Sequence, residues 1–265
     1  MLKVRVIPTL LWKQFGLVKG VGFDSWRRVG PVLPAISVYN QREVDELVLL
    51  DIVAHQSHDD PDVESIADFA QECFVPLTVG GGITRVEQVQ GLLRAGADKI
   101  AVNTAAYDRP SLLTDVASTY GAQCVVASID VRATDGGWTC FSHAGRENTG
   151  RDVVRWAREV EDRGAGEILV TSIDRDGTMQ GYDLALIEAV AGAVGIPVIA
   201  SGGAGTYQHM ADAVLQAGAS AVAAASIFHF TEQTPAAAKA HLAAAGIPVR
   251  RTFQPEPTRG VPACC

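Results

Sequence analysis

Short apolar runs rich in β-branched residues recur along the chain, and longer stretches with helically spaced apolar residues separate them. Such runs predict buried strands. Eight strands are expected, over residues 4–8, 46–52, 75–79, 99–103, 124–130, 167–174, 196–201 and 220–226. The intervening segments, such as 83–97 and 149–166, have the pattern of amphipathic helices. Strand and helix therefore alternate, which predicts an α/β fold with parallel strands.

An internal repeat narrows the choice of fold. Segment 75–105 resembles segment 196–228, so that Gly82 aligns with Gly203, and Glu46 aligns with Glu167 at the same offset. Two similar halves of four units each predict one closed (β/α)8 TIM barrel, here over residues 1–252. An open doubly wound sheet gives the same alternation, but it predicts no half-repeat.

Composition agrees with one barrel and limits the partners. A chain of 265 residues with a net charge of −8 suits a single barrel and disfavours binding to nucleic acid or to a membrane surface. No apolar stretch approaches the ~18 residues of a membrane span, and no signal peptide is recognisable, so a cytoplasmic location is expected. The proline-containing segment 253–265 is expected to be a disordered tail.

The cysteines and histidines show no spacing typical of metal sites. The five cysteines lack C-x-x-C spacing and the six histidines lack HExxH spacing. His55 and His58 share a segment with Asp59 and Asp60, for which a solvated loop is the preferred interpretation. We expect reduced thiols, no metal and no cofactor.

Two glycine-rich turns follow strands of the two halves. Gly80–Gly82 comes after the third strand and Ser201–Gly203 after the seventh. Small polar residues end the strands that follow, at Asn103-Thr104 and at Ala225-Ser226. Backbone N–H groups of such turns can bind phosphate, although a glycine turn can also simply close a strand–helix connection. The equivalent positions predict two phosphate sites facing each other across the mouth, and a long substrate with phosphate at both ends.

Carboxylates at strand ends are candidates for acid/base chemistry. Asp51, Asp130, Asp174 and Asp176 all occupy such positions. Asp130 ends a buried run, and burial would raise its pKa toward a useful range, whereas capping a helix or loop is the alternative role. Its repeat partner is Leu11, which cannot carry a proton.

Charged residues also occur near the strand starts and in the segment after the first strand. Arg5, Glu46, Lys99 and Glu167 are expected to form a ring at the bottom of the barrel, either as a structural plug or as a gate for a small neutral molecule. Lys19 lies in the segment 16–23, which is predicted as a long loop. There it could contact phosphate or belong to a lid, or it could simply be solvated.

Several motifs together resemble one family. IPTLL, LVKG, PLTVGGGI, SIDRDGT and IPVIASGGAG make the chain similar, over residues 1 to about 252, to HisF, the cyclase subunit of imidazole glycerol phosphate synthase. The resemblance implies a lyase or cyclase that takes ammonia from a HisH-like glutaminase docked at the N-terminal face and uses it at the C-terminal face on a phosphorylated small molecule.

The resemblance also implies roles for individual residues. Phosphate contacts fall on Gly82, Asn103, Thr104, Ser201, Gly202, Gly203, Ala225 and Ser226. The ammonia gate falls on Arg5, Glu46, Lys99 and Glu167. Asp130 takes a catalytic role, and Lys19, Asp51, Thr171 and Asp176 form the polar set around it.

The family's other catalytic aspartate belongs to an IPCLDVKDG segment, and this chain has Leu11 at that position, within IPTLLWKQFG. Residues 40–52 also resemble a divergent branch linked to acetamidino modification of surface-polysaccharide sugars, whereas SIFHF and GIPVR look like the histidine-pathway cyclase.

Three hypotheses about the function follow. The chain supplies ammonia to a sugar amidotransferase for amidine formation on a nucleotide-linked sugar; or it is a cyclase in which Asp176 or Asp51 replaces the missing carboxylate; or it is a non-catalytic scaffold that activates the glutaminase.

Overall fold

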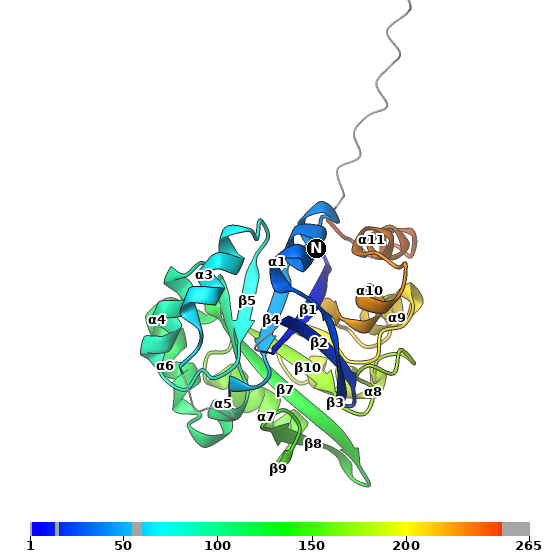
Figure 1. The fold of residues 1–265 in the computed structure, drawn as a ribbon. Helices are drawn as coiled ribbons and strands as arrows, with labels where there is room; N and C mark the ends of the chain where they lie inside the picture. The colour runs from blue at the N-terminus through cyan, green and yellow to red at the C-terminus, as the bar shows by residue number, and fades with distance from the viewer. Residues whose placement is uncertain (1, 14–15, 55–59, 251–265) are drawn as a thin grey trace, which may run out of the picture.

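Eight parallel strands close into a barrel in the computed structural model, which describes residues 2–13, 16–54 and 60–250 (Figure 1). Around the barrel the strands follow the order β10, β11, β12, β1, β4, β5, β6 and β7, and β7 pairs with β10 to complete the circle. Their bounds are β1 Arg5–Lys13, β4 Leu47–Asp51, β5 Leu77–Gly80, β6 Lys99–Val102, β7 Val125–Thr134, β10 Glu167–Ser172, β11 Val198–Ser201 and β12 Ala221–Ala224. The closed (β/α)8 barrel is thereby confirmed.

Helices cover the outside of the barrel (Figure 1). Their bounds are α1 Val32–Gln41, α3 Val63–Gln71, α4 Val86–Arg94, α5 Thr104–Asp108, α6 Ser111–Tyr120, α7 Val153–Asp162, α8 Leu184–Ala191, α9 Tyr207–Leu215, α10 Ser226–Phe230 and α11 Pro235–Ala244, with a short 3-10 helix η1 at Ala122–Cys124. Asp152, Asp183 and Thr206 cap α7, α8 and α9 through their side chains.

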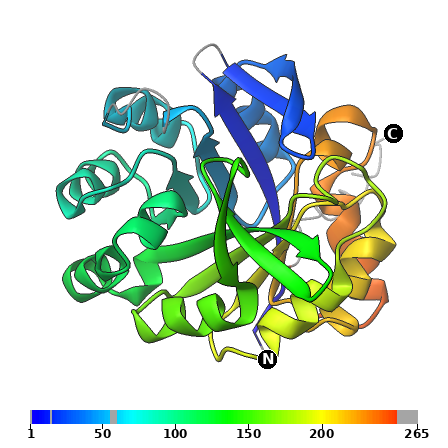
Figure 2. The same ribbon diagram turned by 90° about the horizontal axis from the view of Figure 1, so that it is seen from below.

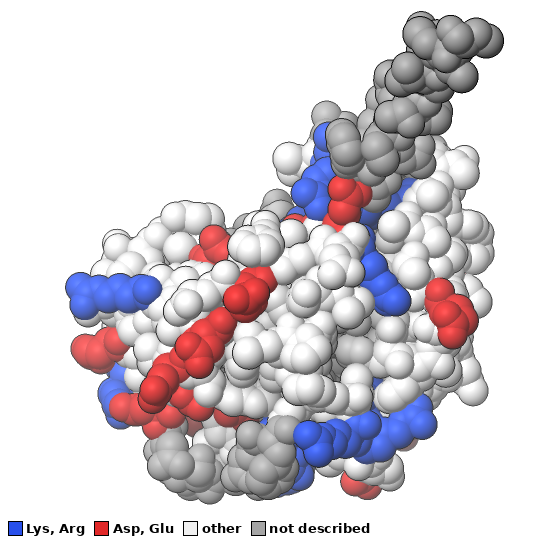
Figure 3. Space-filling model, turned by 45° about the horizontal axis from the view of Figure 1, so that its top comes forward, with Lys and Arg blue, Asp and Glu red and all other residues white. Residues whose placement is uncertain are grey.

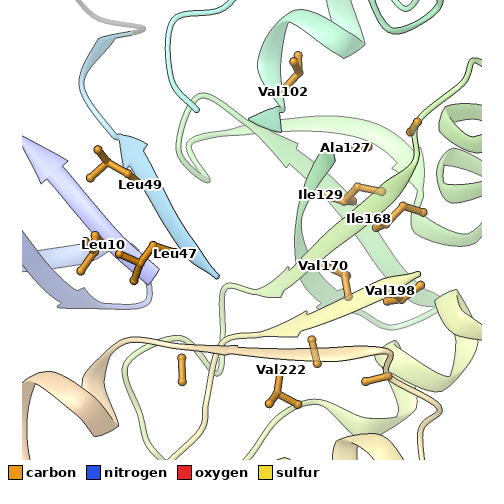
Figure 4. Packing of buried hydrophobic residues seen from close by; sticks show 14 of the residues in the cluster. Leu10, Leu47, Leu49, Val102, Ala127, Ile129, Ile168, Val170, Val198 and Val222 are labelled. Atoms are coloured by element: carbon orange, nitrogen blue, oxygen red, sulfur yellow. The ribbon is translucent and has the colours of Figure 1, made fainter. Parts of the chain in front are cut away.

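The alternation of strand side chains creates two separate apolar clusters. One set, including Leu10, Leu49 and Ile168, points outward and packs against the helices (Figure 4). The alternate set fills the barrel axis and consists of Ile7, Val48, Ala101, Val126, Leu169, Ile199, Ala221 and Ala223. The barrel is therefore filled by side chains in layers rather than open along its length.

Two antiparallel hairpins extend the barrel on the face turned to the viewer in Figure 2. The first joins β2 Gly16–Val21 to β3 Asp24–Gly30, and β2 pairs with β1. The second joins β8 Gly137–Ser142 to β9 Glu147–Asp152, and β8 pairs with β7. The prediction that residues 16–23 form a loop was wrong, because β1 and β7 both continue past the barrel and offer an edge for pairing.

The surface charge and the helix lengths bear on the predictions about nucleic-acid and membrane binding. On the face drawn in Figure 3, acidic side chains gather in an oblique band, and most of the surface carries no charge. Among the described residues, no helix is long and apolar enough to cross a membrane. His55, His58 and the tail 253–265 lie outside the described residues.

The outer apolar layer is expected to dominate the stability of the barrel. Leu49 is 1% exposed and Leu215 is 60% exposed. Replacing Leu49 by alanine should lower the free energy of unfolding in urea by about 2–5 kcal/mol, because it removes buried methyl groups and leaves a cavity. The matched Leu215→Ala change should stay within about 0.5 kcal/mol of the parent. Equal losses for the two variants would contradict the assigned layers.

Candidate active site

A large pocket occupies the C-terminal mouth of the barrel. Most of the upper-face residues that the sequence analysis singled out line it: Lys19, Asp51, Gly82, Asn103, Thr104, Asp130, Thr171, Asp176, Ser201, Gly202, Gly203, Ala225 and Ser226. These residues come from strands and loops around the whole barrel, and closure of the sheet brings them together. Active sites of closed α/β barrels lie at this end.

The two glycine turns pack against the neighbouring strand end in the same way. A Cβ atom on Gly81 would lie 2.3 Å from the carbonyl oxygen of Asp51, and one on Gly202 would lie 2.6 Å from that of Ser172. Both glycines also have positive φ, 113° and 85° respectively. The turns therefore require glycine, and the absence of side chains leaves their backbone accessible to an anion in the pocket.

Asp130 is a half-buried carboxyl group within this pocket. The amide nitrogen Nδ2 of Asn103 donates a 2.7 Å hydrogen bond to its Oδ2. Burial, and secondarily the negative charge of Asp176, raise the pKa of Asp130 to about 7. A carboxyl group with such a pKa exchanges protons readily at neutral pH, which suits a general acid or base.

Lys19 and Asp176 form a buried ion pair beside Asp130. Lys19 Nζ lies 2.5 Å from Asp176 Oδ2, and the lysine side chain is 2% exposed. Burial raises the pKa of Asp176, and the nearby ammonium group of Lys19 only partly offsets this effect. The backbone N–H of Gly22 also donates to the Asp176 carbonyl oxygen, at 2.9 Å. These contacts fix the β2–β3 hairpin to the loop after β10.

Leu11 and Asp130 occupy equivalent places in the two halves. Leu11 pairs with Val18 where β1 meets its hairpin, and Asp130 pairs with Phe141 where β7 meets the other. Both side chains line the pocket. The carboxyl group on β7 thus faces a mouth whose β1 side carries a leucine.

Two other candidate carboxylates have structural partners. Asp51 Oδ1 accepts backbone hydrogen bonds from Val53 and Ala54, at 2.8 and 3.0 Å, and thus shapes the loop after β4. Asp174 accepts one from Ala133 at 3.0 Å and does not line the pocket. Asp174 is therefore removed from the set of candidate proton carriers.

The four charged residues at the strand starts meet at the opposite end of the barrel in a closed ring of ion pairs. Arg5 lies 2.6 Å from Glu46 and 2.8 Å from Glu167. Lys99 lies 3.0 Å from each of the same two glutamates. Glu46 also accepts a 2.7 Å hydrogen bond from Thr78. Each charge has two partners of opposite sign, which compensates the cost of partial burial.

The sequence did not single out several residues that the pocket contains. Thr9 Oγ1 and Asn103 Oδ1 are buried and have no hydrogen-bond partner among the described residues, and both residues line the pocket. The inward alternation Arg5, Ile7, Thr9 along the first strand could have identified Thr9. Phe23 and Trp26 of the first hairpin also line the pocket. Their position follows from strand pairing that the local sequence does not reveal.

Metal binding has no visible support in the part of the chain that the structure describes. There, no group of three or more His, Cys, Asp or Glu side chains is arranged to hold a metal ion.

Comparisons with known proteins agree with this geometry. Residues 5–234 match the protein family described as "Histidine biosynthesis protein". The chain is 52% identical over 250 residues to the "Imidazole glycerol phosphate synthase subunit HisF" of Hyphomonas neptunium (strain ATCC 15444), and the match covers 94% of this chain and 99% of the relative.

The raised pKa of Asp130 predicts a specific dependence of stability on pH. Its pKa is about 7 when folded against an ordinary value of 3.8, so the folded protein binds more protons between these values and loses stability as pH rises through them. Asp130→Asn should remove this loss. Between about pH 4 and about pH 7, the free energy of unfolding of the variant should therefore rise relative to that of the parent, by about 4 kcal/mol at most. Urea unfolding across this range measures the gain.

A neutral change in the same pocket provides the control. Thr171→Val removes no carboxyl group and should keep the parent's pH trend. A constant difference between Asp130→Asn and the parent at all pH values would contradict the assigned pKa.

Proposed function

The chain belongs to the histidine biosynthesis protein family as a HisF-like cyclase subunit of the imidazole glycerol phosphate synthase type, and from that premise we propose that it receives ammonia from a glutaminase partner and uses or delivers it at the barrel mouth. The supporting observation is the arrangement along one axis of a charged ring, an apolar layer and a pocket that contains a carboxyl group with a raised pKa. We assign this activity to the cytoplasm.

The layers along the axis suit a neutral molecule. In the proposed route, the ring of Arg5, Glu46, Lys99 and Glu167 is the entrance, and the ion pairs must separate to admit a molecule. The apolar layer above it would impose a large desolvation cost on ammonium but little on ammonia. Beyond it, the unpartnered oxygens of Thr9 and Asn103 can accept N–H hydrogen bonds.

The pocket offers the groups that an addition of ammonia requires. The two glycine turns would bind the phosphate groups at the ends of the substrate, which places its centre near Asp130. Asp130 can take a proton from the attacking nitrogen and return it to a leaving oxygen or nitrogen, because its pKa lies near neutrality. Lys19 supplies a positive charge that its ion pair with Asp176 holds in place.

Leu11 favours amidine formation on a nucleotide-linked sugar as the reaction that uses the ammonia. Cleavage together with ring closure would use an acid and a base on opposite sides of the substrate, and the β1 side here presents an alkyl group. Delivery of ammonia to a sugar amidotransferase does not need that second carboxylate. This finer assignment rests on Leu11 and on the resemblance of residues 40–52 to the acetamidino branch.

A second candidate function is the cyclase of histidine biosynthesis. The 52% identity to a HisF, over nearly the whole length of both chains, favours it. In that case Asp176 would be the second proton carrier, since its pKa is also raised and it lies close enough to Asp130 to influence it. A purely non-catalytic scaffold is the weakest candidate, because it would have no use for the pocket.

A direct assay separates these candidates. The purified protein is mixed with an ammonium salt and the ribulosyl aminoimidazole carboxamide ribotide, and the loss of substrate absorbance is followed. Because a missing general acid or base lowers rates by about 10²–10⁴, we expect turnover at least about 100-fold below that of the H. neptunium relative assayed in parallel. Turnover equal to that of the relative would overturn the amidine assignment in favour of the histidine-pathway cyclase.

Replacing Leu11 by aspartate should raise the cyclase activity by about 10²-fold, since the change restores a proton carrier opposite Asp130. Leu11→Asn is the matched control, because asparagine has the same shape as aspartate but does not ionise. A similar gain in both variants would point to polarity rather than proton transfer, and no gain in either would mean that Leu11 does not account for the reduced rate.

A further inference from the structure

Each glycine-rich turn of the mouth leads into a helix, and the third residue of that helix directs its side chain back onto the turn. In the first half this residue is Gln88 of α4, and in the second half it is His209 of α9. The offset between them is the one that relates Gly82 to Gly203. The two residues are therefore equivalent in the repeat, and the chemistry proposed above assigns no role to either.

Gln88 accepts two backbone hydrogen bonds from the first turn. Its Oε1 accepts the N–H of Thr84 at 2.8 Å and the N–H of Arg85 at 2.9 Å. Its Nε2 donates to the carboxylate of Asp60 at 2.7 Å, which fixes the orientation of the amide group. A carboxamide does not ionise. The first turn can therefore keep these contacts at any pH at which the protein is folded.

His209 holds the second turn in the same way, but through an imidazole nitrogen. The N–H of Gly205, which is equivalent to Thr84, donates to His209 Nδ1 at 3.2 Å. A ring nitrogen that accepts a hydrogen bond carries no proton, so the proton of the neutral ring lies on Nε2. The equivalent of Asp60 is Gly181, and the imidazole packs over it, because a Cβ atom there would lie 3.5 Å from His209 Cδ2.

Two glycines connect His209 to the backbone that faces the pocket. The N–H of Gly181 donates to the carbonyl oxygen of Gly203 at 2.8 Å, and Gly203 lines the pocket. Gly205 follows two residues later, and its carbonyl oxygen accepts a 3.1 Å hydrogen bond from Gln233. His209 itself does not line the pocket. It therefore acts on the turn from behind, without contact to a ligand in the mouth.

We propose that His209 is a positioning residue that makes anion binding at the second glycine turn weaker in acid, whereas Gln88 holds the first turn independently of pH. A protonated imidazole has an N–H on both nitrogens and cannot accept the N–H of Gly205. Its positive charge would also lie in the first turn of α9, where the helix dipole disfavours a cation. Both effects release the second turn. The inference rests on the proposed function for the anion sites, and it adds how each site is held.

Charged and titratable groups occur on the elements that pack around His209: Arg175, Asp183, Asp212, Glu232 and His241. Among the described residues, none of them bonds to the His209 ring, whose one hydrogen bond there is to Gly205. His241 lies on α11 and contacts the side chain of Gln208 at 3.2 Å rather than the turn. It is therefore a matched control histidine.

Amide NMR of the isotope-labelled full chain tests the coupling without a ligand. The amide signals of Gly203 and Gly205 are followed from about pH 5 to about pH 8, the range in which histidine side chains change charge. We expect both signals to move together with the ring signals of His209, and the signal of Thr84 not to follow them. His209→Gln should abolish this movement, because glutamine can accept the same N–H groups as Gln88 does. His241→Gln should keep it.

Sulfate is the anion probe, because it keeps its charge over this range, whereas phosphate does not. The amide signals of Gly82 and Gly203 report its affinity at the two turns in one sample, so that changes in the net charge of the protein act on both. We expect the affinity at Gly203 relative to Gly82 to fall about fivefold from about pH 8 to about pH 5, the effect of losing one neutral hydrogen bond. In His209→Gln the ratio should change by less than about twofold.

The outcomes separate this proposal from the proposed function. If sulfate binds at both turns with a ratio that is constant, or that rises in acid, the positioning role of His209 is overturned while the anion sites stand. A movement of the Gly205 signal that persists in His209→Gln overturns it as well. If sulfate binds at neither turn at any pH, the anion sites of the proposed function fail and this proposal fails with them. Urea unfolding establishes that each variant is folded.

Discussion

The inward and outward alternation of side chains on closed parallel strands is the constraint on which the rest of this structure depends. Along β1, Arg5 joins the charged ring, Ile7 fills the axis, and Thr9 and Leu11 line the pocket. One strand thus contributes to every layer. A shift of one residue would turn all these side chains toward the helices, so core packing and functional layers fix the same register.

Burial controls the behaviour of charge at both ends of the barrel. At the bottom, four charges compensate one another, and each has two partners. At the mouth, Asp130 accepts a hydrogen bond from Asn103 and belongs to none of the ion pairs found among the described residues, and its pKa rises instead. The same desolvation cost is met by pairing at one end and by proton uptake at the other. Only the second response leaves a group able to transfer protons at neutral pH.

The sequence predicted those features that local patterns determine. The eight strands, the half-repeat and the glycine turns were visible because apolar period and glycine positions are local signals. Lys19 was wrongly placed in a loop, because β2 exists only through pairing with the extended end of β1. Trp26 escaped notice for the same reason. Asp51 and Asp174 looked alike in sequence, and only the fold shows that backbone N–H groups bind both and that Asp174 is outside the pocket.

The half-repeat has one consequence beyond its symmetry. Each position of the repeat occurs twice in the barrel, so the two copies can carry residues of different chemistry. Here the β7 half retains Asp130, and the β1 half presents Leu11 beside the aromatic rings of its hairpin. A barrel built from two copies of the second half would carry paired carboxylates at these positions. The asymmetry between the halves therefore confines the ionisable group at this pair of positions to the β7 side of the mouth.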